Sequence, residues 1–353
     1  MLLVVHRILY NSGRLVCGSI NTVKQFGYGW KQCVSTLPAL AAIAAVGAAS
    51  AQVTVYGKLD VGVSNTSAGG TVIGVNTWET SRFGVKAEQK EAGLTFSVNL
   101  EGKISNGAGA FGGFDRTATV GVSGGFGTVT IGSQWTPFDN AIWTSDALEY
   151  NGFTPLTGLK AAWNYDLGNA PNMYGNAVNS IQYATPDMNG FQAIILTAPN
   201  NGGAFSGAKD YSGIGLNYAK GPLTINFATQ SFSGAGTPTS NSNVLSFQYN
   251  MGTAIVMGGV VNSDSGSNTG WGAANWNVGT DKGYIVGVKV PMGKNSVSVG
   301  FSGNTNSVSG KDKTINSWGA QFIQGLSKST KAYYGIQSVD GTNKTGAGLQ
   351  YNF

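Results

Sequence analysis

Apolar and polar residues alternate in the last segment of the chain, and this pattern constrains the fold more than any other feature. Across positions 347–353 the odd-numbered residues are Ala, Leu, Tyr and Phe, whereas the even-numbered residues are Gly, Gln and Asn. Successive side chains of a β-strand point to opposite faces, so this segment has an apolar face ending in an aromatic residue and a polar face. Such a strand suits a barrel with lipid outside and water inside.

The same two-residue period recurs along the chain in segments bounded by Gly, Pro, Asn, Asp and Ser. Many of these segments have about the 9 to 11 residues that a tilted strand needs to cross a bilayer. Tight connections such as Gly221-Pro222 alternate with longer polar ones, as expected for periplasmic turns and outer loops. The pattern predicts an all-β fold over residues 52–353, a 16-stranded antiparallel transmembrane β-barrel. The predicted strands are 53–63, 81–90, 94–103, 116–123, 127–134, 179–185, 191–198, 211–220, 223–231, 242–250, 253–262, 281–290, 295–301, 314–325, 330–339 and 345–353.

Other architectures are less consistent with the sequence. A secreted β-solenoid would also have a mean hydropathy near zero, but it would show a fixed repeat period, which the sequence lacks. After residue 51 no run of about eighteen apolar residues occurs, which excludes helical membrane spans there. An exported β protein used for adhesion or surface display remains the alternative to a channel.

Residues 1–51 have the features of an export signal. Lys24 and Lys31 precede an apolar run over 37–46, and Ala49-Ser50-Ala51 forms a small-x-small cleavage site. We therefore expect a signal peptide over residues 1–51, with cleavage after Ala51. The part before Lys24 is longer than a usual signal n-region, which leaves open an extended signal or a translation start nearer Lys24.

Removal of this leader changes the chemistry available to the chain. His6, Cys17 and Cys33 all lie within it, so the mature chain has no histidine, no cysteine and no disulfide framework. Four of the 21 basic residues also lie there, leaving 17 basic against 16 acidic residues, which gives no support to nucleic-acid binding. Catalysis that depends on histidine, or a transition-metal site, is therefore not expected, and we predict neither an enzyme nor a cofactor. Asp146 and Glu149 form the best carboxylate pair for glycoside chemistry, but acids in a loop are more often solvated.

The connection over 135–178 is much longer than the others. It contains three prolines, many aromatic residues and four acids. Long connections in compact folds are usually functional or disordered, and a segment this aromatic is not expected to be disordered. Because a sixteen-stranded barrel has a lumen wide enough for a folded segment, we predict that this loop folds inward and narrows the channel.

Alternation also places two basic side chains in the lumen. Phe83 and Val85 belong to the lipid face, so Arg82 points inward, and the same reasoning turns Lys58 inward. A charge on the lipid face would cost on the order of 2–4 kcal/mol. Arg116 shares the parity of the apolar Ala118, so a bulge or a position at the strand mouth is needed to turn it inward.

The order and spacing of several short blocks carry a family resemblance. The blocks are 53–62, 81–86, 116–122, 126–132, 179–183, 190–191, 221–223, 326–330 and the terminal Phe353. Together they resemble the Gram-negative trimeric porins, particularly those of β-proteobacteria. The resemblance covers essentially all of residues 52–353.

This resemblance implies a homotrimer in the outer membrane of a Gram-negative bacterium. Each barrel would contact lipid and form a water-filled channel for passive diffusion of ions and small hydrophilic solutes, with its third loop folded inside. Within channels, a substrate-specific pore is the alternative, and its solute would block conductance in a saturable way.

The resemblance also implies a constriction with a field between basic wall residues and acidic loop residues. The residues at the matching positions are Lys58, Arg82, Arg116, Asp146 and Glu149, with Asp139 and Asp166 as further candidates. Two positions depart from the family, because Ser133 and Asn176 stand where arginine is frequent. We therefore expect weak anion preference, or none.

Overall fold

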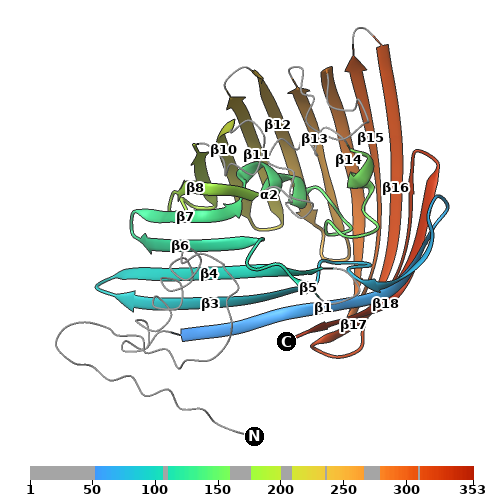
Figure 1. Ribbon diagram of the computed structural model, residues 1–353, viewed down its shortest axis with the longest axis horizontal. Coiled ribbons are helices and arrows are strands. Elements are labelled where there is room, and N and C mark those ends of the chain that lie inside the picture. The colour runs from blue at the N-terminus through green and yellow to red at the C-terminus, as the bar shows by residue number, and fades with distance from the viewer. Residues whose placement is uncertain are drawn as a thin grey trace, which may run out of the picture. The chain divides into compact units, whose positions relative to one another are not determined.

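The computed structural model describes residues 52–105, 110–159, 176–199, 209–234, 237–265, 279–308 and 311–353 (Figure 1). Three predictions lie outside the described residues. They are the signal peptide over 1–51, the candidate acid Asp166, and the inward fold of residues 160–175 in the long connection.

Sixteen strands of the described residues form one closed antiparallel barrel, and the predicted fold class is confirmed. Each strand pairs with the next barrel strand, and β1 pairs with both β3 and β18, which closes the ring. The barrel strands are β1 (Gln52–Thr66), β3 (Arg82–Glu91), β4 (Leu94–Ser105), β6 (Thr117–Gly124), β7 (Gly127–Trp135), β8 (Asn176–Ala184), β9 (Phe191–Ala198), β10 (Lys209–Lys220), β11 (Leu223–Gly234), β12 (Thr237–Asn250), β13 (Ile255–Ser265), β14 (Gly279–Met292), β15 (Asn295–Val308), β16 (Lys311–Gly325), β17 (Thr330–Val339) and β18 (Thr342–Asn352). Two short strands, β2 (Gly70–Val75) and β5 (Ala110–Phe111), pair with β1 and β4 respectively.

Side chains alternate between the two faces of the barrel wall, as a two-residue period requires. On β12, Leu245 and Phe247 are exposed, whereas Val244 and Ser246 are buried. The exposed positions give the wall an apolar outer surface that suits lipid. The described part of the chain has no helix with the length and hydropathy needed to cross a membrane.

One connection differs from the prediction. The sequence pattern separates the last two strands by five residues, but β17 and β18 are joined by Asp340 and Gly341 alone. Both residues have positive φ, 48° and 83°, as the central pair of a type I′ hairpin turn does. Asp-Gly is a preferred pair for this turn, so the strands extend to it and the expected long loop is absent here.

The connection between β2 and β3 folds back toward the lumen. Trp78 in this connection is 1% exposed, and its indole N–H donates to Oε1 of Gln321 at 3.0 Å. Its ring centroid lies 5.0 Å from that of Tyr333. The backbone N–H of Trp78 donates to the Asp60 carboxylate at 2.9 Å, which fixes the connection to β1. Residues 76–81 are therefore a second inward segment, which the sequence analysis did not predict.

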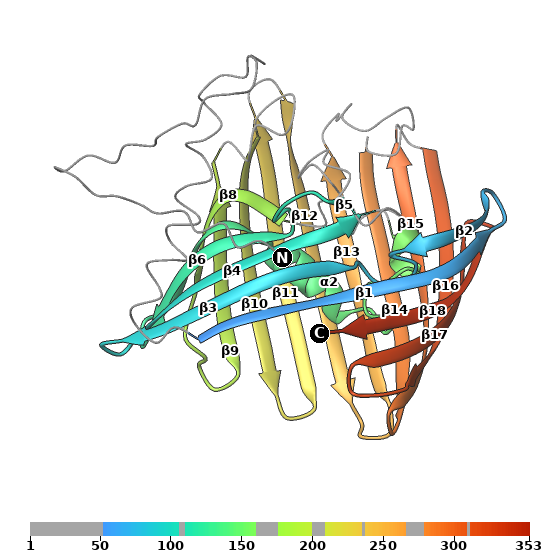
Figure 2. The same ribbon diagram turned by 60° about the horizontal axis from the view of Figure 1, so that its bottom comes forward.

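The long connection after β7 packs against the inner face of the wall as far as Leu159. It begins with α2 (Pro137–Thr144), whose cap Thr136 accepts a hydrogen bond from the backbone N–H of Asp139 at 3.1 Å. It continues to a short 3-10 helix, η2 (Pro155–Gly158). Helix α2 contacts β9 to β13, and η2 contacts β15 to β17. Figures 1 and 2 both show α2 between the β1–β3 side and the β10–β13 side of the barrel.

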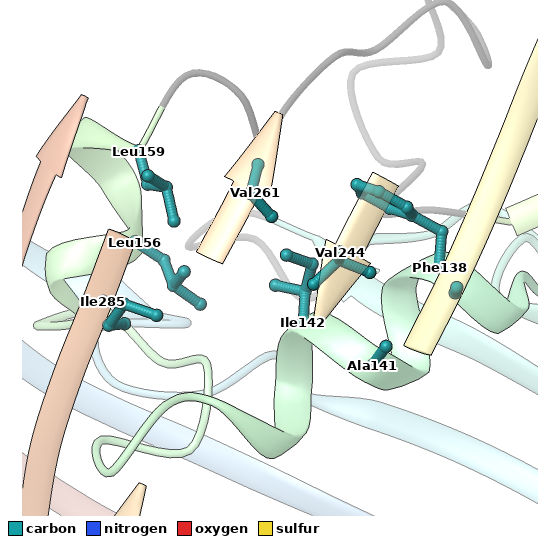
Figure 3. Packing of buried hydrophobic residues seen from close by; sticks show 9 residues of the cluster. Phe138, Ala141, Ile142, Leu156, Leu159, Val244, Val261 and Ile285 are labelled. Carbon is teal, nitrogen blue, oxygen red and sulfur yellow. The ribbon is translucent and has the colours of Figure 1, made fainter. Parts of the chain in front are cut away.

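Buried apolar side chains fasten this loop to the wall. Figure 3 shows residues of α2 and of the η2 region packed beside inward-facing residues of β12, β13 and β14. Burial of one such side chain contributes roughly 1.5–3 kcal/mol. The labelled residues are Phe138, Ala141, Ile142, Leu156, Leu159, Val244, Val261 and Ile285.

Glycines in the wall allow the loop to approach this closely. At Gly319 and Gly335 a Cβ atom would overlap Phe153, which is fully buried. Leucine and alanine side chains of the loop take the same kind of position over three further glycines. We call the five residues the glycine face of the wall: Gly283, Gly287, Gly300, Gly319 and Gly335.

Candidate constriction site

A cavity of about 910 Å³ lies between the inward loop and the wall that carries β1, β3 and β4. All five residues predicted for the constriction line this cavity: Lys58, Arg82, Arg116, Asp146 and Glu149. The structure therefore brings them together, and their part in permeation stays a prediction.

The three predicted basic residues form a chain of ion pairs with two acids that the sequence analysis missed. Glu79, from the inward segment before β3, pairs with Lys58 and lies 3.5 Å from Arg82. Glu101, on β4, lies 3.6 Å from Arg82 and 2.7 Å from Arg116. Burial alone would raise the pKa of Glu79, but the charges of Lys58 and Arg82 hold it below its usual value.

Arg116 lies at the strand mouth, one of the two positions that could turn it inward. It directly precedes β6 and is 4% exposed. Its guanidinium stands over the ring of Trp135, 5.2 Å from the centroid, so a cation–π contact adds to the ion pair. The Asn176 side chain donates to the Arg116 carbonyl oxygen. Asn176 thus holds the strand mouth without adding charge.

Asp146 organises the loop. Its carboxylate accepts hydrogen bonds from the backbone N–H groups of Leu148 at 3.0 Å and Tyr150 at 2.8 Å, and from the Thr154 hydroxyl at 2.6 Å. The residue is 2% exposed. Burial raises the pKa of Asp146, although these hydrogen bonds oppose the shift. Its two oxygens therefore accept hydrogen bonds within the loop.

Glu149 has a basic partner that the sequence analysis also missed. It forms an ion pair with Lys289 of β14. Glu149 and Tyr150 both have left-handed backbone, with φ of 62° and 57°. Residues other than glycine adopt this region at a cost, and the bonds to Asp146 and Lys289 hold it in place.

Asp139 is buried in α2 and is not among the residues that line the cavity. One carboxylate oxygen accepts a hydrogen bond from the Tyr150 hydroxyl at 3.3 Å, and the other has no partner among the described residues. Burial raises the pKa of Asp139 to about 7. The described residues contain no cluster of His, Cys, Asp or Glu that could hold a metal ion.

A closed barrel with an apolar outer surface and a charged internal cavity defines an outer-membrane channel protein. Residues 39–344 match the model of the Gram-negative porin family, and the chain belongs to this family. It is an outer-membrane channel for passive diffusion, and not an enzyme.

Individual relatives agree with this assignment. The chain is similar to outer membrane porin protein 32 of Delftia acidovorans, with 32% identity over 240 residues, 63% of this chain and 68% of the relative. It is 29% identical to the major outer membrane protein P.IB of Neisseria gonorrhoeae over 196 residues, and this match covers 51% of this chain and 52% of that protein. The solved anion-selective porin from Comamonas acidovorans has a TM-score of 0.69 at 23% identity, covering 86% of this chain and 100% of that one.

Proposed function

We propose that the cavity is the narrow part of a water-filled channel for ions and small hydrophilic solutes, and that it favours anions. The observation that carries this proposal is the charge of the lining, where six Lys and Arg residues stand against three acids. Glu101 is not in the lining but forms ion pairs with Arg82 and Arg116, and when it is counted the basic residues still exceed the acidic ones by two.

The arrangement of these charges supports the same preference. Asp146 is buried within the loop, so its charge acts on the passage less directly than those of Lys58 and Arg82, whose side chains are 20% and 18% exposed. Lys103, Lys289 and Lys344 also line the cavity, so the lining stays rich in basic residues although Ser133 and Asn176 are uncharged. An excess of positive charge in a narrow passage with low-dielectric walls raises the local concentration of anions. We therefore propose a clearer anion preference than the sequence analysis suggested.

Reversal potentials in planar bilayers under a KCl gradient test this proposal. We expect chloride to be more permeant than potassium, with the ratio approaching that of free solution as the salt concentration rises. A reversal potential that shows potassium to be more permeant would overturn it.

We also propose that three copies assemble, with the apolar outer face in contact with lipid. The family resemblance supports a trimer, and one solved structure that shares the fold, OmpT of Vibrio cholerae, is described in a trimer form. Light scattering of the protein in detergent, together with electrophoresis with and without heating, measures the assembly. A folded, conducting monomer would contradict the trimer and leave the channel assignment intact.

Finally, we propose that the mature chain begins at Gln52. The support is the site Ala49-Ser50-Ala51 and the start of β1 directly after it. N-terminal sequencing of protein from the outer membrane identifies the first residue. A mature protein that retains residues 30–48 would contradict the proposal.

A further inference from the structure

Three aromatic side chains form a ladder along one side of the cavity. The ring centroids of Trp135 and Trp143 are 5.4 Å apart, and those of Trp143 and Tyr150 are 5.5 Å apart. All three residues line the cavity, and Trp143 is 41% exposed. We call Trp135, Trp143 and Tyr150 the aromatic ladder. The core packing of α2 uses Phe138, Ala141 and Ile142, so it does not account for Trp143.

Positive charge stands at both ends of the ladder. At one end Arg116 lies over the Trp135 ring, and the ion-pair chain continues from it to Arg82 and Lys58. At the other end Tyr150 follows Glu149, which pairs with Lys289. A solute that reaches the ladder therefore meets flat aromatic surface between the ion pairs Arg116–Glu101 and Lys289–Glu149, in a lining where basic residues exceed acidic ones.

The class of solute that this surface can bind depends on which acidic oxygens are already engaged. Glu79 and Glu149 already accept from lysines, and the Asp146 oxygens accept hydrogen bonds within the loop. A neutral sugar would need acceptors as well as donors around its hydroxyls, whereas the charged groups that surround the ladder are mainly donors. A carboxylate attached to a flat ring suits both the aromatic ladder and the basic residues. The ring can stack on the aromatic side chains, and the carboxylate can accept hydrogen bonds from Lys or Arg.

We propose that the aromatic ladder is a binding site for small aromatic carboxylates on their way through the channel. All three ladder residues line the proposed passage, so a permeating solute can contact them. This proposal rests on the proposed channel function and gives it a class of preferred solute.

The test compares two anions of equal charge and similar size, benzoate and cyclohexanecarboxylate, on single channels of the full protein in planar bilayers. We expect benzoate to reduce chloride current in a saturable way, at a half-blocking concentration about three- to tenfold below that of cyclohexanecarboxylate, as one stacking contact provides. Equal half-blocking concentrations, or block that does not saturate, would overturn the proposal. So would stronger saturable block by neutral glucose, because it would assign the ladder to sugars.

Variants separate the ladder from the field around it. Trp143→Leu should raise the half-blocking concentration of benzoate about three- to tenfold and leave that of cyclohexanecarboxylate unchanged, whereas Trp143→Phe should retain most of the difference. The matched control is Trp318→Leu on β16, which removes a tryptophan that is 38% exposed on the outer face and should have no effect. If Trp143→Leu leaves benzoate block unchanged, the ladder is not the site.

A second readout keeps the result independent of current. Quenching of tryptophan fluorescence by benzoate should saturate in the wild-type protein and weaken in Trp143→Leu. Reversal potentials in KCl, measured in the same bilayers, report the proposed anion preference separately. Absence of saturable benzoate block and quenching in the wild-type protein, with the anion preference intact, would overturn this inference and leave the proposed function standing.

Discussion

Gly57 and Phe353 exchange two backbone hydrogen bonds, 2.9 Å from the Gly57 N–H to the Phe353 carbonyl and 3.1 Å from the Phe353 N–H to the Gly57 carbonyl. They lie where β1 and β18 meet, and the Phe353 ring covers Gly57 so closely that a Cβ atom would overlap it. The pairing of the first and last strands is thus stabilised at this end by two backbone hydrogen bonds and by the packing of the Phe353 ring on Gly57.

Replacement of Phe353 by alanine should lower the yield of folded barrel. The variant keeps both backbone hydrogen bonds but removes the ring that packs on Gly57, so the last strand is held less firmly when the ring of strands closes. The fraction of outer-membrane protein that is heat-modifiable in electrophoresis measures the effect. Leu349→Ala, which truncates another exposed residue of β18, is the control and should have the smaller effect. Equal yields for the two variants would contradict the prediction.

Replacement of Lys58 and Arg82 by glutamine should shift selectivity toward cations. The lining loses two of its six basic charges, so we expect the chloride-to-potassium permeability ratio to fall about two- to fivefold. Glu79→Gln should shift the ratio in the opposite direction, because it leaves both bases without that partner. Both shifts should shrink as the Debye length falls from about 10 Å at 0.1 M salt to about 3 Å at 1 M. Unmoved reversal potentials in both variants would remove these residues from the constriction.

Replacement of Gly335 by alanine should displace the inward loop. The new side chain would overlap the Phe153 ring, and overpacking of this kind costs about 1–3 kcal/mol. We expect a larger and noisier single-channel conductance, because the loop moves off the wall. Gly74→Ala, which adds a methyl group in open space, is the matched control. In the double variant Gly335→Ala/Phe153→Ala, the change in conductance should be smaller than the sum of the changes in the two single variants. A sum that matches would argue against the contact.

Asp139 should make the loop less stable as the pH rises. Its pKa in the folded protein is about 7, above the roughly 3.9 of an unfolded chain, so folding favours the protonated form. The stabilisation is fully present below about pH 4 and is lost as the pH rises toward 7. The titratable groups near Asp139 are the Tyr150 hydroxyl, the Tyr211 hydroxyl of β10 and, at longer range, the Arg116 guanidinium. Thermal denaturation of the detergent-solubilised protein across this range should show the fall, and Asp139→Asn should flatten it. If the dependence of thermal stability on pH is the same in the wild type and in Asp139→Asn, Asp139 is not the group responsible.

Local patterns predict the strands but not the partners of the charged groups. The two-residue period is a property of each segment by itself, so the strands and the inward direction of Lys58 and Arg82 follow from the sequence. Glu101 could have been found in the same way, because it shares the parity of Lys103 within one predicted strand. The pair Asp340-Gly341 likewise carries a hairpin signal that the sequence analysis passed over.

Glu79, Lys289 and Lys344 could not be placed in this way. Glu79 reaches Lys58 only because residues 76–81 fold inward, and that path depends on Trp78 meeting Tyr333 on β17, far along the chain. Lys289 and Lys344 line the cavity because the barrel closes and brings β14 and β18 near the loop. The buried role of Asp146 depends on the fold of the loop itself, which no alternation describes.

The glycine face of the wall limits how this loop could be moved between proteins. Phe153, Leu148, Leu159 and Ala147 occupy the space that wall side chains would otherwise fill. A barrel with larger residues at those five positions therefore has no room to receive them. If residues 136–159 alone were grafted into another sixteen-stranded barrel, the loop would therefore have no surface on which to pack. The transferable unit is the loop together with Gly283, Gly287, Gly300, Gly319 and Gly335.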